Sequence, residues 1–314
     1  MTDKNDLISI IIPTYKGAKT LSKLVDELLL TFKDHKVEII IVNDFSPDNT
    51  HIDSKILLKK YPNKITYLKL SKNFGEHCAT MAGLRHSEGG LVVIMDDDFQ
   101  NPPEEALKLV LYSLKNDHDV TFTKYKIKND SLIRNIMSKI ANVSAQMILK
   151  KPKDIYFSSF KSIKRNLVDE IIKYEGPFPY IDGLILSITN NFGSCDVIHN
   201  ERKFGKSGYN LGKLFKHYSN LSINFSTIPI HLFSILGFAI TIVSFMLIVG
   251  IVIEKLTNPS VPLGYSTLIA CIIFFSGVQL LFLGLLGEYI GKILKNVNKE
   301  KQYNISFLQK KIDN

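Results

Sequence analysis

Two long stretches in the carboxyl-terminal third of the chain contain no charged residue. They cover residues 232–253 and 267–287 and are 22 and 21 residues long. An apolar helix of about 20 residues spans the hydrocarbon core of a bilayer. A water-soluble protein rarely contains a helix of that length without a polar face. We therefore expect two transmembrane helices, joined by a short loop outside the cytoplasm.

Positive charge gathers on both sides of these two stretches. Residues 201–231 contain five Lys and Arg against one acid, and residues 289–314 contain six against two. The loop between the two stretches has a single basic residue, Lys255. The positive-inside rule places both flanks in the cytoplasm, which predicts a multi-pass protein of the inner (cytoplasmic) membrane. Anionic lipid headgroups and lipid phosphate account for the net charge of +9 without a nucleic-acid partner.

The amino-terminal part of the chain alternates short apolar runs with segments of helical character. Apolar runs at residues 7–13, 37–44, 65–70 and 91–95 indicate strands, and capping or apolar spacing between them indicates helices. Strands that alternate with helices of this length form βαβ units. We predict an α/β fold with a mainly parallel sheet, whose strands carry their polar carboxyl ends into one crevice.

Three aspartates, Asp96, Asp97 and Asp98, directly follow the fourth apolar run. Adjacent carboxylates repel one another at neutral pH unless a cation lies among them, and oxygen ligands suit a hard divalent cation. Alternate residues of an extended chain point the same way, so Asp96 and Asp98 share a face with Gln100 beyond them. We predict a Mg²⁺ or Mn²⁺ site for a substrate diphosphate. An acidic turn that is only solvated is the alternative.

Residues at the ends of the other strands should meet these aspartates in the crevice. They are Pro13, Tyr15, Asp44, Lys72 and Asn73. Several polar strand ends at one crevice suggest a nucleotide's base and ribose beside a metal-bound diphosphate. No GxGxxG follows the first strand and no GxxxxGK[ST] occurs, which argues against dinucleotide oxidoreductases and P-loop enzymes.

Together these motifs resemble the catalytic domain of family 2 inverting glycosyltransferases. The matching segments are Pro13-Thr-Tyr15, residues 42–44 with Ser46 and Asp48, residues 71–75 and residues 96–104. The similarity is greatest to the polyprenyl-phosphate branch, which includes dolichol-phosphate mannose synthases and bacterial undecaprenyl-phosphate sugar transferases. The resemblance implies a nucleotide-binding glycosyltransferase A-type domain and assigns the metal to Asp96, Asp98 and Gln100.

Three residues in two motifs depart from the pattern of this branch. Asp97 replaces the small residue that is usual between the two metal-binding aspartates. Lys16 and Gly17 stand where an Asn-Glu pair is common, so the nucleotide pocket lacks one carboxylate there.

Residues 124–153 carry eight Lys and Arg against one acid, with apolar residues at helical spacing. This pattern predicts a basic amphipathic helix at a membrane surface, or else a solvated charged face. In the family this segment holds the lipid phosphate with arginines. Arg134 matches such an arginine, and Lys126 and Lys128 stand roughly where arginines are usual.

A second cationic segment, residues 201–214, contains glycines that suit a loop around a phosphate. It resembles the family's Arg-x-x-Gly-x-Ser-x-Tyr segment, with Arg202 and Ser207 among the matching residues. Farther on, residues 284–292 resemble the Gly-Glu-Tyr-x-Gly-Arg segment that ends the second span in bacterial lipid-phosphate glycosyltransferases. Glycines there allow close helix contact, either in a homo-oligomer or within one chain.

The sequence thus predicts a metal-dependent glycosyltransferase. It would transfer a single sugar, with inversion, from a nucleoside diphosphate sugar (UDP or GDP) to a polyprenyl phosphate at the cytoplasmic membrane face. The expected catalytic residues are Asp96, Asp97 and Asp98. The expected nucleotide-binding residues are Pro13, Tyr15, Asp44, Lys72, Asn73 and Asp97. The expected acceptor-phosphate residues are Lys126, Lys128, Arg134, Arg202 and Ser207.

Two alternatives are a processive polysaccharide synthase and a non-catalytic membrane scaffold that keeps the fold. The synthases resemble a pattern that ends in Gln-x-x-Arg-Trp, and this chain has no tryptophan. The expected division of the chain is a cytoplasmic catalytic domain (1–210), a juxtamembrane amphipathic segment (211–231), two transmembrane helices (232–288) and a basic cytoplasmic tail (289–314).

Overall fold

A computed structural model describes residues 6–125, 157–198 and 200, scattered positions between 235 and 257, and residues 264–312. The chain divides into two compact units. One comprises Met1–Gly208 together with Lys299–Asn314, and the other is Tyr209–Asn298.

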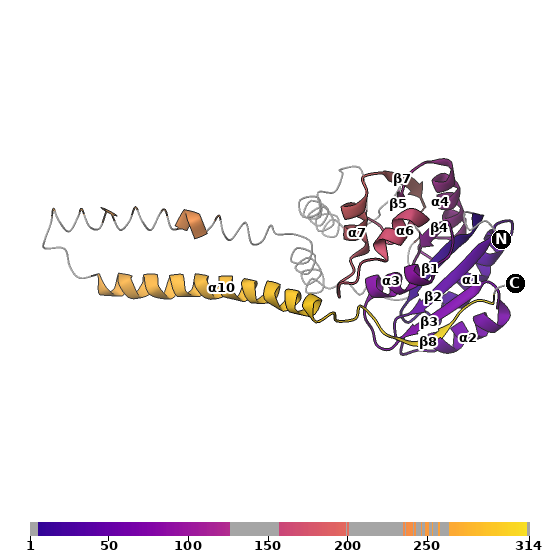
Figure 1. The fold of residues 1–314 in the computed structure, drawn as a ribbon, viewed down its shortest axis with the longest axis horizontal. Coiled ribbons are helices and arrows are strands. Elements are labelled where there is room, and N and C mark those ends of the chain that lie inside the picture. The colour runs from indigo at the N-terminus through magenta and orange to yellow at the C-terminus, as the bar shows by residue number, and fades with distance from the viewer. Residues whose placement is uncertain are drawn as a thin grey trace. The chain divides into compact units, whose positions relative to one another are not determined.

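The first unit is built on an eight-stranded sheet with helices on both faces (Figure 1). The strand order is β7-β5-β6-β4-β1-β2-β3-β8. The strands are β1 Ile8–Thr14, β2 Val37–Asn43, β3 Ile65–Leu70, β4 Leu91–Ile94, β5 Val120–Tyr125, β6 Lys161–Lys164, β7 Phe192–Val197 and β8 Ile305–Gln309.

Most neighbours in the sheet run parallel, which confirms the predicted α/β class. Strand β1 pairs in parallel with β2 and β4, β2 with β3, and β5 with β7. Strand β6 runs antiparallel to β4 and β5, and β8 runs antiparallel to β3. Lys124 lies in β5, so the basic segment starts in a strand, and the amphipathic helix predicted within it lies outside the described residues.

Helices cover both faces of the sheet, so residues on alternate sides of one strand belong to different cores. Ile39 and Ile41 lie in one apolar cluster, and Ile40 and Val42 lie in the other. Burial on both faces explains why β2 is a continuous apolar run rather than an alternating one. The helices of this unit are α1 Leu21–Thr31, α2 Thr50–Lys60, α3 Glu76–His86, α4 Pro103–Lys115, α6 Arg165–Ile171 and α7 Ile181–Ile188.

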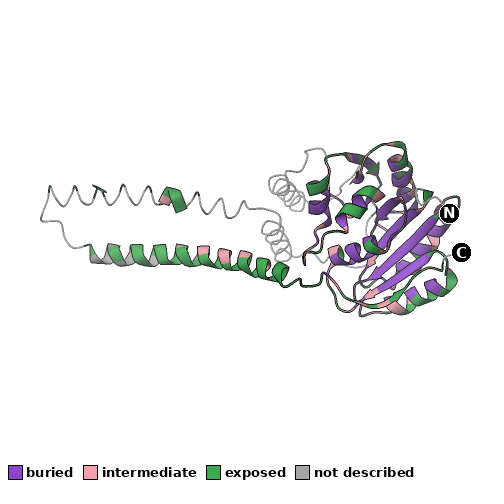
Figure 2. Cartoon of the chain, in the orientation of Figure 1, coloured by how far each residue is buried: buried purple, intermediate pink, exposed green. Residues whose placement is uncertain are grey.

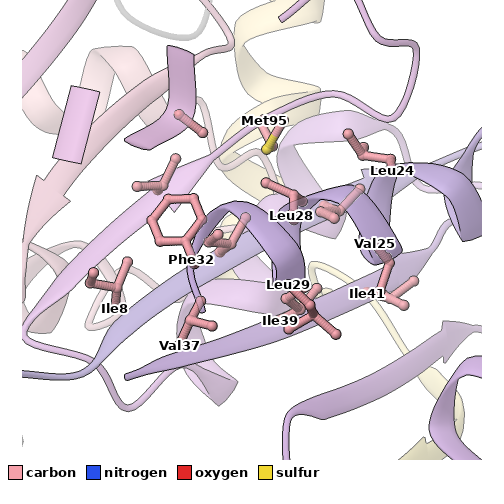
Figure 3. Packing of buried hydrophobic residues seen from close by; sticks show 14 of the residues in the cluster. Ile8, Leu24, Val25, Leu28, Leu29, Phe32, Val37, Ile39, Ile41 and Met95 are labelled. Carbon is pink, nitrogen blue, oxygen red and sulfur yellow. The ribbon is translucent and has the colours of Figure 1, made fainter. Parts of the chain in front are cut away.

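Helix α1 illustrates how the sequence pattern becomes packing. Its buried residues recur at three- and four-residue spacing, which forms one apolar face. Figure 3 shows Leu24, Val25, Leu28 and Leu29 on this face, packed with Phe32 above residues of β1 and β2. This packing fixes where the loop between β1 and α1 leaves the sheet.

Strands β4, β1 and β2 lie side by side, and their carboxyl ends point the same way. Thr14 is in register with Asn43, and Ile11 is in register with Ile94. Backbone hydrogen bonds continue past the strand ends, from Asp44 N to Thr14 O at 2.9 Å and from Met95 N to Ile11 O at 3.1 Å. The loops that follow β1, β2 and β4 therefore begin at one edge of the sheet.

The carboxyl-terminal segment, residues 299–312, returns to this sheet and adds β8 beside β3. The buried Gln302 donates hydrogen bonds to Tyr174 O at 2.7 Å and Gly176 O at 2.8 Å. At the other end, Lys311 Nζ lies 2.5 Å from Glu38 Oε2. The sequence predicts a basic cytoplasmic tail over this segment and gives no indication of β8.

In the second unit, the described part of the chain contains helix α10, Tyr265–Val297. Phe274–Val297 within it is long and apolar enough to cross a membrane, with a mean hydropathy of 1.4. The helix covers the second predicted span and continues beyond it. Most of the first predicted span, residues 232–253, lies outside the described residues, so the pair of transmembrane helices stays a prediction.

Candidate active site

The β1–α1 loop, residues 15–20, is held by side chains from the loop after β2. Lys16 N donates to Ser46 Oγ at 3.0 Å, and Ala18 N donates to Asp48 Oδ2 at 3.3 Å. Ser46 N in turn donates to Asn43 Oδ1 at 2.7 Å. Ser46 is thereby tied to the end of β2, so the loop after β2 holds the β1–α1 loop beside it.

Asp44 joins the end of β2 to the loop after β3. Its side chain is buried, and its two oxygens accept hydrogen bonds from Phe74 N at 2.7 Å and Gly75 N at 2.8 Å. Burial raises the pKa of Asp44, and these two hydrogen bonds act against that rise. Gly75 has a φ of 94°, which an L side chain rarely adopts, so glycine is needed at this turn.

The three aspartates after β4 are half-buried and turn to three different partners. Asp96 Oδ2 accepts a hydrogen bond from Ser159 Oγ at 2.6 Å, and Asp98 Oδ1 accepts one from Gln100 N at 3.0 Å. Asp97 Oδ2 accepts a hydrogen bond from the Thr14 hydroxyl. Since β4 lies between β1 and β6, Asp96 and Asp97 are tied to opposite sides of their strand.

Negative charge is concentrated at this edge. Burial, with the neighbouring Asp96 and Asp98 adding to it, raises the pKa of Asp97 to about 6 against the opposing hydrogen bond from Thr14. A divalent cation would offset this charge, and the carboxylates of Asp96 and Asp98 with the amide of Gln100 are oxygen donors of the kind that Mg²⁺ and Mn²⁺ take. Within the described ranges, no three His, Cys, Asp or Glu side chains are arranged to hold a metal. The predicted set contains only two such residues, so it stays a prediction.

A buried ion pair that sequence reasoning missed lies close to this edge. Lys161 of β6 pairs with Asp182 of α7, and its Nζ lies 5.4 Å from the centre of the Phe122 ring. The two partners are only 3% and 7% exposed. Lys161 begins β6, two residues after Ser159, which contacts Asp96. The ion pair therefore holds α7 beside β6. Nothing local in the sequence indicated that β6 neighbours β4.

The predicted nucleotide-binding residues all lie on the loops or strand ends of this edge. Hydrogen bonds link Asn73 Nδ2 to Asp44 O at 3.4 Å and Asp97 to the end of β1. Pro13 is half-buried, whereas Tyr15 and Lys72 are exposed. Lys72 Nζ lies 4.9 Å from the centre of the Phe74 ring.

The five predicted acceptor-phosphate residues lie outside the described part of the chain. They are Lys126, Lys128, Arg134, Arg202 and Ser207. One described contact lies next to them in sequence: Asn200 N donates to Gln100 O at 2.8 Å, two residues before Arg202.

A family model described as "Glycosyl transferase family 2" matches residues 9–172. The chain is 30% identical over 312 residues to the undecaprenyl-phosphate 4-deoxy-4-formamido-L-arabinose transferase of Proteus mirabilis, covering 98% of this chain and 94% of the relative. The protein of the same name from Yersinia enterocolitica is 32% identical over 313 residues, with the same coverage of both chains.

Solved structures share the fold at low sequence identity. Glucosyl-3-phosphoglycerate synthase from Mycobacterium tuberculosis in complex with uridine diphosphate superposes with a TM-score of 0.52 at 16% identity, covering 69% of this chain and 78% of that one. The same enzyme in complex with Mn²⁺, uridine-diphosphate-glucose and phosphoglyceric acid gives a TM-score of 0.51 with the same coverage.

Proposed function

Because this chain belongs to glycosyl transferase family 2, we propose that it transfers a single sugar from a nucleoside diphosphate sugar to undecaprenyl phosphate. The observation that carries the proposal is the meeting of Asp44 and the Asp96–Asp98 triplet at one edge of the sheet. Relatives that match nearly the whole chain are named for transfer to this acceptor, which supports it further. No observation favours a processive polymerase or a non-catalytic scaffold.

The donor would bind at the carboxyl ends of β1, β2 and β4. Asp44 and the loops after β1 and β3 would hold the nucleotide, with Pro13, Tyr15, Lys72 and Asn73 as the other proposed contacts, and Asp97 completes the proposed nucleotide-binding set. Asp96, Asp98 and Gln100 would hold Mg²⁺ or Mn²⁺. When bound, this cation neutralises charge that develops on the departing diphosphate. A neighbour of the same fold is described with Mn²⁺ and uridine-diphosphate-glucose, which favours a uridine nucleotide.

The acceptor phosphate would lie beside the metal site. The hydrogen bond from Asn200 to Gln100 supports this location, because the cationic glycine-rich segment begins directly after Asn200. Arg202 and Ser207 of that segment, with Lys126, Lys128 and Arg134, would orient the phosphate toward the anomeric carbon. The acceptor is already an anion, so the reaction needs no residue that removes a proton from it.

The sugar would belong to the class for which the relatives are named, a 4-deoxy-4-formamido-L-arabinose. Helix α10 and residues 232–253 would anchor the protein in the inner membrane, with the catalytic domain in the cytoplasm. The division into residues 1–210, 211–231, 232–288 and 289–314 remains our proposal, as does a homo-oligomer packed through the glycines of residues 284–292.

A transfer assay tests the proposal. Membranes that contain the protein are incubated with undecaprenyl phosphate and radiolabelled uridine- or guanosine-diphosphate sugars, with Mn²⁺, Mg²⁺ or a chelator. We expect a lipid-linked sugar that forms only with metal. Asp98→Ala should lower transfer by about a hundredfold or more while leaving membrane insertion intact. Asp34→Ala, at an exposed aspartate in the turn before β2, is the matched control. Full activity of Asp98→Ala would refute the site.

A further inference from the structure

Gly17 is a glycine because of what lies beside it. A Cβ atom at this position would overlap a carboxylate oxygen of Asp97 and the hydroxyl of Thr14. Among the described glycines only Gly75 has a positive φ, so the backbone at Gly17 would accept an ordinary L residue. A larger residue here would force the side chains of Asp97 and Thr14 to move, whereas the backbone conformation itself does not demand glycine.

Asp97 occupies the space that Gly17 leaves. Its carboxylate crosses from the end of β4 to the hydroxyl of Thr14, the last residue of β1. The β1–α1 loop starts at the next residue and is held on its other side by Ser46 and Asp48. The β1–α1 loop is thus held from two sides. Ser46 and Asp48 hold it from the loop after β2, and Asp97 holds its start from the end of β4.

We propose that Asp97 is a positioning residue that shapes the nucleotide-binding β1–α1 loop through Thr14, in space that Gly17 leaves open. The proposal rests on the proposed function, since the loop is assigned to the nucleotide there. Asp97 then differs in role from Asp96 and Asp98. Its contact with Thr14 requires a hydrogen-bond acceptor, whereas metal binding by its neighbours requires negative charge.

Substitutions that keep or remove the acceptor separate these roles. An asparagine side chain still offers one oxygen to Thr14 but carries no charge. We expect Asp97→Asn to raise the KM for the nucleotide sugar by about threefold, a smaller loss than that of Asp97→Ala, because one acceptor oxygen remains. Asp97→Ala should raise this KM by about tenfold or more, the loss typical of a hydrogen bond to a charged group, with a smaller effect on kcat.

The matched control is the charge-removing change at a neighbour. Asp98→Asn should lower kcat by about a hundredfold and weaken Mn²⁺ binding, because it replaces the negatively charged carboxylate that would bind the cation with a neutral amide. If Asp97→Asn is as damaging as Asp98→Asn, then Asp97 acts through its charge and the proposed positioning role is overturned.

A thermal-unfolding cycle tests the pairing with Gly17 without any assay of transfer. Gly17→Ala should lower the Tm of the full chain, because the new methyl group collides with the Asp97 carboxylate. In the Asp97→Gly background the same change should lower the Tm by less than half as much, since Thr14 can then rotate away. Equal losses in both backgrounds would overturn the pairing.

The two experiments also separate this inference from the proposed function. If the wild-type protein binds neither uridine nor guanosine diphosphate, the proposed function fails, and the positioning of a nucleotide loop fails with it. The steric pairing of Gly17 with Asp97 would still be decided by the unfolding cycle. If the wild type transfers sugar and Asp97→Asn does not, only the inference fails.

Discussion

The sheet of the first unit and helix α10 are both rich in apolar residues, but their exposure is opposite. Ile10 and Ile40 in the sheet are 0% exposed, whereas Leu280 and Leu283 in α10 are 68% and 62% exposed. Figure 2 shows this contrast as purple strands and a mostly green helix. The sheet is covered by its own helices, while α10 displays apolar side chains along its length.

The two regions are therefore stabilised by different surroundings, water around the sheet with its helices and a bilayer around α10. Burial of apolar area drives the sheet and its helices together in water. A continuous apolar surface on a helix longer than about 20 residues is instead suited to the hydrocarbon core of a bilayer. Equivalent substitutions in the two regions should therefore have different consequences, measured by different experiments.

The largest effect is expected from truncating a phenylalanine in the covered region. Phe32 is 0% exposed and packs at the end of α1, so Phe32→Ala should lower the free energy of unfolding of the catalytic unit by about 4 kcal/mol. Phe274 of α10 is 61% exposed, and Phe274→Ala should change the same quantity by less than about 0.5 kcal/mol. Urea unfolding of the detergent-solubilised protein measures both. Similar losses for the two variants would contradict the distinction.

A charge placed on α10 should have a slightly smaller effect, on insertion and not on folding. Leu280→Arg places a guanidinium within the candidate span, where it costs about 3 kcal/mol. We expect a clear fall in the fraction of protein that resists carbonate extraction from membranes. Leu114→Arg is the control, because Leu114 is a 59% exposed leucine on α4 of the first unit. It should leave extraction unchanged, and equal loss for both variants would refute the membrane role of α10.

The sequence predicted the parts of the sheet whose pattern is local. Residues 65–70 form an apolar run between turn residues, and β3 has those same bounds. Two strands were missed for physical reasons. Strand β5 was missed because it ends at Lys124 and Tyr125, and Lys124 was grouped with the basic segment that follows. In β8, a five-residue edge strand with half-exposed side chains, the local pattern is weak and the partner, β3, lies far away in the sequence.

The candidate site likewise contains residues that the local sequence predicts and contacts that it does not. Asp44 and Asp96 to Asp98 could be predicted because acids directly follow apolar runs. The contacts of Ser159 with Asp96 and of Gly17 with Asp97 could not, because they depend on β4 lying between β6 and β1. Strand order is set by tertiary packing and has no local sequence signal.

The smallest of these effects concerns the carboxyl-terminal segment, which follows α10 in sequence but belongs to the covered region. Lys311 pairs with the buried Glu38, so Lys311→Met should lower the free energy of unfolding by about 2 kcal/mol. The loss stays moderate because Glu38 keeps hydrogen bonds from Ser9 Oγ at 2.6 Å and Glu88 N at 2.7 Å.

The neighbouring lysine provides the control, and pH provides a second test. Lys310 is exposed, and Lys310→Met should change the free energy of unfolding by less than about 0.5 kcal/mol.

Burial alone would lower the pKa of Lys311, but its contacts with Glu38 and Glu88 raise it. A raised lysine pKa stabilises the folded state at neutral pH, and this contribution is lost as pH rises through the raised pKa. The difference between wild type and Lys311→Met should therefore persist at neutral pH and shrink in alkaline buffer. Equal stability of the two lysine variants at neutral pH would mean that the Lys311–Glu38 ion pair does not stabilise the fold.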